Sequence, residues 1–224
     1  MQRLVRDDPE RPDPGFAELY ASLPDASGDR LQPWLEWSSR ARPPVLYLGV
    51  GAGRLAVPLS SAGVRLVGVD AHPGMLEALR RRRTGIELVQ ARIETLDLGR
   101  RYDLVIGPSS ILGSEANLAA GARHARRWVG LEVMNPHWLL AGGSPGVRVT
   151  ATDRRRRAAI EVDYPGGYTQ LAEGPLVWPE QIEGWLEAAG LRLVRMSGSA
   201  LDLDVSPTYF VLATTLPVGD FSLL

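Results

Sequence analysis

The chain of 224 residues contains no cysteine and no lysine, and it has only three histidines. Without cysteine it can form no disulfide, no thiolate nucleophile and no cysteine-ligated zinc or iron site. Lysine chemistry is excluded as well, because all 25 basic residues are arginines. The histidines lie far apart in the sequence and no acidic cluster has ligand spacing, so we expect no metal site.

The sequence also lacks an excess of charge and a long apolar run. Its formal net charge is -1 and its pI is about 6.3, which predicts no nucleic-acid partner and no anionic membrane surface. Arginine runs at 80–83 and 154–157 are not interleaved with aromatic residues, so we interpret them as solvated faces. No apolar run approaches the length of a membrane span, and the first six residues lack the apolar core of a signal peptide. We expect a cytoplasmic protein. Whether it forms a homodimer is left open by the sequence.

The chain divides into a short leader and one domain. Residues 1–15 carry several prolines among charges, which predicts a disordered leader, and residues 16–224 are expected to form a single domain. From Val45 onward, apolar strand patterns alternate with helical patterns at 55–62, 75–82, 117–128 and 179–189. Strands are expected at 45–48, 65–69, 87–90, 103–106, 129–134, 191–196 and 208–214. This alternation predicts an α/β, Rossmann-like fold with a doubly wound, mainly parallel seven-stranded sheet.

Between about 146 and 176 the pattern changes to segments of period two joined by turn-rich or charged links. Such segments are typical of antiparallel strands. We therefore predict a small antiparallel insert in the domain at this place.

A glycine-rich loop follows the first predicted strand. Gly49, Gly51 and Gly53 alternate between that strand and a helix, and glycines there let a ligand lie against the main chain beside the helix N-terminus. Asp70 ends the second predicted strand, where a carboxylate can accept hydrogen bonds from both hydroxyls of a ribose. A dinucleotide fingerprint counted from Gly49 requires glycine at position 54, which is Arg54, so NAD fits less well.

Three segments carry a resemblance to a known family, namely residues 48–56, 68–76 and 102–106. Together they resemble the class I S-adenosylmethionine-dependent methyltransferases, in particular the small-molecule branch of bacterial secondary metabolism and antibiotic biosynthesis. The match extends from about Phe16 to Thr214. The resemblance implies S-adenosylmethionine as the cofactor, with the three glycines under its methionyl part and Asp70 at its ribose. It also implies that Ala71 and Met75 flank the adenine and that Tyr20 lies on an N-terminal helix closing over the cofactor.

The chain departs from the family at two positions. The family usually has an acid where this chain has Tyr47, and often an aspartate where this chain has Arg92. An arginine cannot accept a hydrogen bond, so the adenine amino group must be held by backbone near Ile93 and by packing. The first departure removes the acid that helps to fix the methionyl end of the cofactor.

His137 follows the fifth predicted strand and is the candidate general base, because an imidazole has a pKa suited to proton transfer near neutrality. The alternative interpretation is a surface or packing histidine. His72 is expected to cap a helix or to face solvent, and His124 is expected to be solvated. The acceptor pocket is predicted between Tyr20, His137, the turn after the fourth strand and the insert. The substrate-binding candidates are Ser109, Ser110, Leu112, Tyr164 and Tyr168.

The resemblance implies transfer of a methyl group from S-adenosylmethionine to oxygen or nitrogen of a small, mainly apolar natural-product intermediate. Two alternatives stay open. The first is a cyclase or isomerase that keeps this fold and transfers no methyl group, which the two lost acids favour somewhat. The second is a degenerate, non-catalytic partner subunit with an empty cofactor loop.

Overall fold

The computed structural model describes residues 3–8, 10–153, 156–198 and 206–215. The helices are α1 (Pro14–Ser22), η1 (Gly28–Arg30), α2 (Gln32–Ser39), α3 (Ala56–Ser61), α4 (Pro73–Arg81), α5 (Glu115–His124), α6 (Pro136–Leu140), η2 (Pro179–Gln181) and α7 (Ile182–Ala188). The strands are β1 (Arg3–Arg6), β2 (Val45–Leu48), β3 (Leu66–Asp70), β4 (Glu87–Gln90), β5 (Tyr102–Gly107), β6 (Ala125–Met134), β7 (Val147–Asp153), β8 (Arg157–Tyr164), β9 (Tyr168–Pro175), β10 (Arg192–Gly198) and β11 (Thr208–Thr214).

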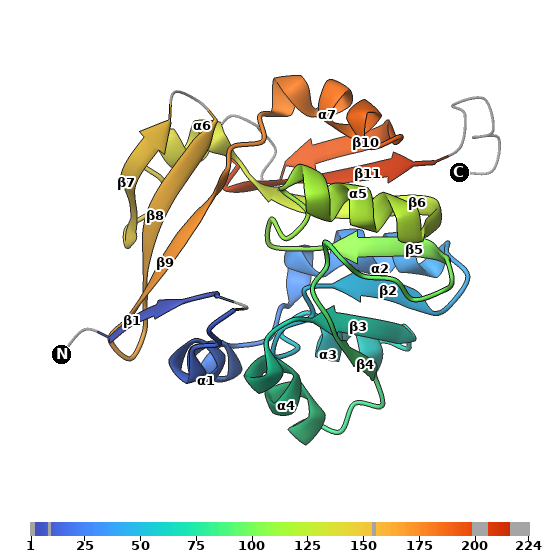
Figure 1. Cartoon of the computed structure of the whole chain (residues 1–224), viewed down its shortest axis with the longest axis horizontal. Coiled ribbons are helices and arrows are strands. Elements are labelled where there is room, and N and C mark those ends of the chain that lie inside the picture. The colour runs from blue at the N-terminus through green and yellow to red at the C-terminus, as the bar shows by residue number, and fades with distance from the viewer. Residues whose placement is uncertain (1–2, 9, 154–155, 199–205, 216–224) are drawn as a thin grey trace.

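The larger sheet has seven strands in the order β10-β11-β6-β5-β2-β3-β4 (Figure 1). Strands β6, β5, β2, β3 and β4 run parallel, whereas β11 is antiparallel to both of its neighbours. This confirms the predicted Rossmann-like, mainly parallel sheet. The strand order reverses at β2, which lies between β3 and β5, and the carboxyl ends of the strands at such a switch point are where open α/β sheets bind ligands.

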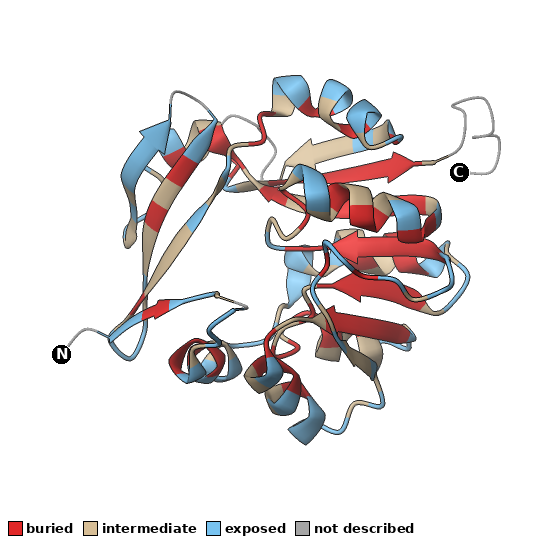
Figure 2. Cartoon of the chain, viewed as in Figure 1, coloured by how far each residue is buried: buried red, intermediate tan, exposed pale blue. Residues whose placement is uncertain are grey.

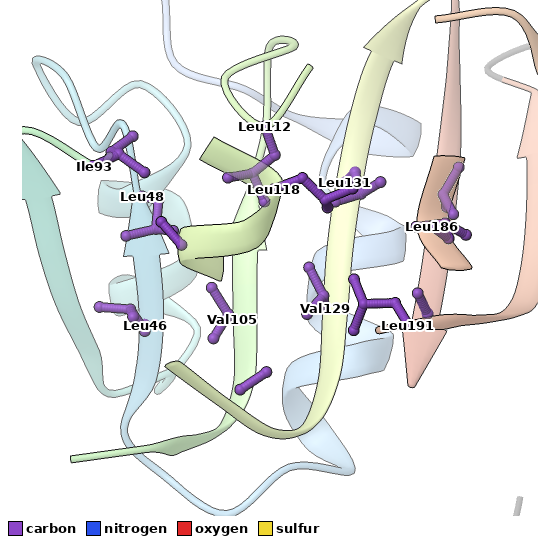
Figure 3. Close-up of a cluster of buried hydrophobic side chains, with 14 of the residues drawn as sticks. Leu46, Leu48, Ile93, Val105, Leu112, Leu118, Val129, Leu131, Leu186 and Leu191 are labelled. Carbon is purple, nitrogen blue, oxygen red and sulfur yellow. The ribbon is translucent and has the colours of Figure 1, made fainter. Parts of the chain in front are cut away.

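Helices cover both faces of this sheet and bury it. One face packs against α5 and α7 through a cluster that includes Leu118 and Leu186 (Figure 3). The other face packs against α2, α3 and α4 through Trp34, Leu59 and Leu76. The central strands are therefore buried throughout, while the helices have one buried and one exposed side (Figure 2).

A second sheet of four strands, β1-β9-β8-β7, stands beside one end of the larger one (Figure 1). Strands β7, β8 and β9 are antiparallel and occupy the place of the predicted insert. The expected disorder of residues 1–15 is wrong for Arg3–Arg6, because β1 pairs in parallel with β9 and buries Val5 against Phe16. The partner strand lies more than 160 residues away along the chain, so local sequence could not indicate the pairing.

The predicted helix over 117–128 is too long. Helix α5 ends at His124, and β6 begins at Ala125, which pairs with Tyr102 of β5. The stretch from Ala125 to Trp128 has helix-forming residues, but it lies between β5 and β11 and pairs with both. Pairing across the sheet therefore overrides local helix propensity here.

No helix among the described residues is long and apolar enough to cross a membrane.

Candidate functional site

A cavity of about 210 Å³ opens at the carboxyl ends of β2, β3, β5 and β6. It lies where the strand order of the larger sheet reverses. Its walls come from the glycine loop, the segment from α1 to α2, the start of α4 and the turn after β5. The smaller sheet contributes Gln170 of β9, and Asp7 follows its strand β1. The lining residues are Asp7, Phe16, Tyr20, Ala26, Arg30, Trp34, Tyr47, Gly49, Val50, Gly51, Ala52, Arg54, Leu55, Asp70, Met75, Pro108, Ser109, Ile111, Glu132 and Gln170.

The three glycines of the loop have φ angles of 72°, 55° and 91°, a region that favours glycine over other residues. They serve different purposes. A Cβ atom at Gly49 would lie 2.6 Å from Ile111, and one at Gly53 would lie 2.5 Å from the end of the Leu79 side chain, so a larger residue at either position would displace its neighbour. A Cβ at Gly51 would meet nothing within 4 Å, and Gly51 lines the cavity. Open space beside a bare backbone is what a ligand lying against the loop requires.

Asp70 is fixed at the end of β3 by two backbone donors. Its Oδ2 accepts from the Gly51 amide at 2.8 Å and its Oδ1 from the His72 amide at 2.8 Å. Burial raises the pKa of Asp70 above its ordinary value, and the hydrogen bonds from these two amides oppose the rise. The carboxylate therefore holds the glycine loop in place and keeps further acceptor capacity toward the cavity.

Helix α4 begins beside Asp70 because His72 caps it. The His72 Nδ1 accepts from the Gly74 amide at 3.1 Å, and Nε2 lies 3.1 Å from the carbonyl oxygen of Asp13, the N-cap residue of α1. This confirms the predicted capping role and ties α1 to α4. Met75, in the first turn of α4, consequently faces the cavity.

The turn after β5 is clamped to β6. Ser109 and Ser110 have positive φ angles of 55° and 61°, which are uncommon for residues other than glycine. The Ser109 amide donates to Glu132 Oε2 at 3.0 Å, and the Ser110 amide donates to the Glu132 carbonyl at 2.8 Å. The Ser110 hydroxyl in turn accepts from the Met134 amide at 2.8 Å. Glu132 thus shapes this wall of the cavity with both its main chain and its side chain.

Helix α1 and the smaller sheet close the remaining side. The Tyr20 hydroxyl donates to Gln170 Oε1 at 3.0 Å. The centroid of its ring lies 4.6 Å from that of Phe16 and 6.2 Å from that of Tyr164. Burial raises the pKa of Tyr20, so its hydroxyl stays protonated. This contact joins α1 to β9 beside the cavity. The closing of α1 over a cofactor stays a prediction.

Of the predicted cofactor-binding residues, five line the cavity: Tyr20, Gly49, Gly51, Asp70 and Met75. Gly53, within the loop, and Ala71, directly after β3, do not line the cavity. Ile93 is buried in the same core cluster as Leu48 (Figure 3). Arg92 is exposed and forms ion pairs with Glu10 and with Glu94, the latter at 3.6 Å.

Of the predicted acceptor residues, only Ser109 lines the cavity. Leu112 is 1% exposed and belongs to the core, because the turn after β5 points it at the sheet rather than at the cavity (Figure 3). Tyr164 and Tyr168 pack around Val5 and Phe16. Ser110 is engaged with β6, as described above.

His137 lies outside the cavity lining. It is in α6, with Nε2 3.1 Å from Glu180 Oε2 and its ring edge-on to Trp178 at 4.9 Å. His124 is buried rather than solvated, since its Nδ1 lies 2.8 Å from the Ala120 carbonyl and its Nε2 accepts from the Leu98 amide at 3.3 Å. Among the described residues no group of three histidines or acids could hold a metal ion.

Sequence reasoning missed several residues of the cavity, chiefly Asp7, Arg30, Trp34, Glu132 and Gln170. Glu132 carried a signal, because it is the single acid of β6 and lies near the carboxyl end of the strand. Asp7 and Gln170 carried none, since both reach the cavity through the pairing of β1 with β9.

The comparisons with known proteins agree with this geometry. Residues 45–130 match a family model described as a methyltransferase domain. That span runs from β2 to β6 and holds both the glycine loop and Asp70. No curated protein matches the chain.

Solved structures share the whole fold at low identity. The CcbJ methyltransferase from Streptomyces caelestis superposes with a TM-score of 0.64 at 22% identity, covering 88% of this chain and 95% of that one. A S-adenosylmethionine-dependent methyltransferase from Clostridium acetobutylicum gives a TM-score of 0.64 at 14% identity, covering 89% and 97%. The glycopeptide N-methyltransferase MtfA complexed with sinefungin gives 0.63 at 18% identity, covering 96% and 93%. The predicted resemblance to class I methyltransferases is thereby confirmed at the level of the fold.

Proposed function

We propose that this chain, which carries a methyltransferase domain on the fold of the class I S-adenosylmethionine-dependent methyltransferases, transfers a methyl group from S-adenosylmethionine to a small molecule. The observation that carries the proposal is the cavity at the switch point of the sheet. It brings the bare backbone of Gly51, the carboxylate of Asp70 and the apolar side chain of Met75 together.

The cavity residues fit an adenosine-containing cofactor. Asp70 offers carboxylate oxygens to a vicinal diol, and Met75 and Phe16 offer apolar surface to a purine ring. Bound S-adenosylmethionine supplies an electrophilic methyl group on its sulfonium. The names of several structural neighbours include S-adenosylmethionine, its demethylated product or sinefungin, which favours this cofactor over NAD.

The contribution of the chain to the reaction is positioning. Methyl transfer is an in-line displacement, so its barrier falls when the acceptor atom is held opposite the sulfonium and water is kept out. The clamp of Ser109 on Glu132 and the Tyr20–Gln170 contact fix two opposite walls of the cavity. Both walls are therefore placed to orient the two reactants.

We further propose that the acceptor is small and mainly apolar and is methylated on oxygen or nitrogen. The walls beyond the glycine loop present the aromatic and apolar side chains of Phe16, Tyr20, Trp34 and Ile111. The polar and charged residues of these walls are Asp7, Arg30, Ser109, Glu132 and Gln170. His137 stays a prediction as the base; its contacts with Glu180 and Trp178 place its ring outside the cavity lining. The neighbours are named as methyltransferases, which favours methyl transfer over a rearrangement.

The proposed function is tested by calorimetry with S-adenosylmethionine, S-adenosylhomocysteine and NAD. We expect both sulfur-containing nucleosides to bind at one site and NAD to bind far more weakly. Consumption of S-adenosylmethionine with release of S-adenosylhomocysteine in the presence of an acceptor would then establish transfer. Binding of neither nucleoside would support the partner-subunit alternative, and turnover without methyl release would support the isomerase.

A glycine substitution separates ligand contact from backbone strain. In Gly51→Ala the methyl group enters the open space beside the cavity, so we expect cofactor affinity to fall by roughly tenfold or more. Gly99→Ala is the matched control, because Gly99 has a similar φ of 61°, equally open surroundings and no place in the cavity. Both variants should lose about 1–2 kcal/mol of unfolding free energy to backbone strain. Equal cofactor affinity in the two variants would contradict the placement of the ligand.

A further inference from the structure

Besides Asp70, the cavity is lined by charges of both signs that form no ion pair with any described residue. They are the guanidinium of Arg54, the guanidinium of Arg30 and the carboxylate of Glu132. Elsewhere in the described chain ten arginines do have acidic neighbours, as Arg148 has in Glu161 and Asp163. Arg30 is exposed, whereas Arg54 and Glu132 are partly buried, and unpaired charges that are partly buried cost free energy unless a ligand compensates them.

The order of strands places Glu132 and Asp70 at opposite ends of the cavity. Asp70 ends β3 and Glu132 lies near the end of β6, with β2 and β5 between them. Three strand spacings of about 4.8 Å separate the two strands by about 14 Å. A ligand that meets both carboxylates must therefore be elongated and lie across the ends of β2 and β5.

Within the described part of the chain, the donors to the Glu132 carboxylate are neutral. Its Oε2 accepts from the Ser109 amide at 3.0 Å, and its Oε1 accepts from the Thr208 hydroxyl at 3.3 Å. These contacts fix the orientation of the side chain without neutralising its charge. A cationic group of a ligand would form a charge-assisted hydrogen bond with it.

Tyr47 lies within electrostatic reach of Glu132, Asp70 and Arg54. Burial raises the pKa of Tyr47, the carboxylates of Glu132 and Asp70 raise it further, and Arg54 lowers it. The hydroxyl therefore stays neutral. Arg54 is anchored by its Nε, which donates to the Pro24 carbonyl at 3.0 Å, so its position beside the glycine loop is set by the segment between α1 and η1.

We propose that Glu132 and Arg54 bind the ammonium and the carboxylate of an α-amino-acid tail, at the opposite end of the cavity from the diol bound by Asp70. The inference rests on the proposed function, since S-adenosylmethionine and S-adenosylhomocysteine each carry a ribose and such a tail. Glu132 then supplies, from β6, the negative charge that Tyr47 on β2 cannot supply.

The test compares two ligands that differ only at the tail end. S-adenosylhomocysteine carries the α-amino acid, whereas 5′-methylthioadenosine keeps the nucleoside and the sulfur without it. By calorimetry we expect Glu132→Gln to weaken S-adenosylhomocysteine binding by roughly tenfold or more and to change 5′-methylthioadenosine binding less than about twofold. Arg54→Met should show the same selectivity. Asp70→Asn should weaken both ligands.

Thr208→Val is the matched control, because it removes one hydrogen bond to Glu132 and leaves the charge in place. It should keep S-adenosylhomocysteine affinity within about threefold of the unmodified protein. The proposal is overturned if Glu132→Gln weakens both ligands equally, or if it leaves S-adenosylhomocysteine affinity intact and lowers only turnover, which would place Glu132 at the acceptor. If the unmodified protein binds neither ligand, the proposed function itself fails.

Discussion

Asp70→Ala is expected to weaken S-adenosylhomocysteine binding by about 1–3 kcal/mol, or roughly 5- to 150-fold. Two effects act together. The variant loses the acceptor for the ribose hydroxyls, and the amides of Gly51 and His72 lose the oxygens that hold the glycine loop. Asp70→Asn keeps one oxygen acceptor and should lose less. Unchanged affinity for the alanine variant in calorimetry would contradict the assignment of the ribose site.

The raised pKa of Asp70 gives this prediction a pH dependence. Affinity in the unmodified protein should fall as the pH drops through that raised pKa, because a protonated carboxyl loses acceptor capacity. The stability of the unliganded protein should change in the opposite sense. The native state holds this proton more tightly than the unfolded state. The contribution of Asp70 to stability is therefore present at low pH, and it is lost as the pH rises from 3.8, the ordinary pKa of an aspartate, through the raised pKa of the folded state. Asp70→Asn should remove both dependences, and the difference between the two proteins isolates this group.

Trp34→Ala is expected to destabilise the fold by about 3–5 kcal/mol, because it removes a large ring from a packed core. Trp34 is 1% exposed. Its ring lies edge-on to those of Trp37 and Phe210, with centroid distances of 5.2 and 5.8 Å, and it forms part of the cavity wall. Urea denaturation followed by circular dichroism measures the change in unfolding free energy.

Trp185→Ala is the control for Trp34, because it removes the same side chain from a half-buried position in α7. We expect it to cost clearly less. Equal losses in the two variants would show that Trp34 contributes no more than ordinary apolar burial. Trp34→Phe should recover part of the loss and, with it, the cavity wall.

The architecture of the larger sheet could be predicted because its signals are local. Buried strands such as β2 and β5 are continuous apolar runs, and alternation with helices implies parallel crossovers. Gly49, Gly51 and Asp70 could be predicted for the same reason, since a strand, a turn and the next strand end fix their positions within a short stretch of chain.

The direction in which the side chains of loop and helix residues near the site point could not be predicted in this way. Leu112 and Ile93 are adjacent in sequence to cavity or loop residues, yet their side chains turn into the core (Figure 3). His137 follows the correct strand, but its own helix directs the imidazole toward Glu180. The direction of a side chain after a strand depends on the turn and on its packing, and local sequence specifies neither.

The sequence by itself determined the fold class, the glycine loop and the acid at the end of β3, because strand periodicity and glycine conformations are properties of short segments. Only the tertiary structure decided which other residues line the cavity beside them. Pairing of β1 with β9 brings Asp7 and Gln170 to the cavity, and the position of β6 in the sheet brings Glu132 opposite Asp70. Both depend on contacts between segments far apart in the chain, whose pairing is selected by the packing of the whole domain rather than by any local pattern.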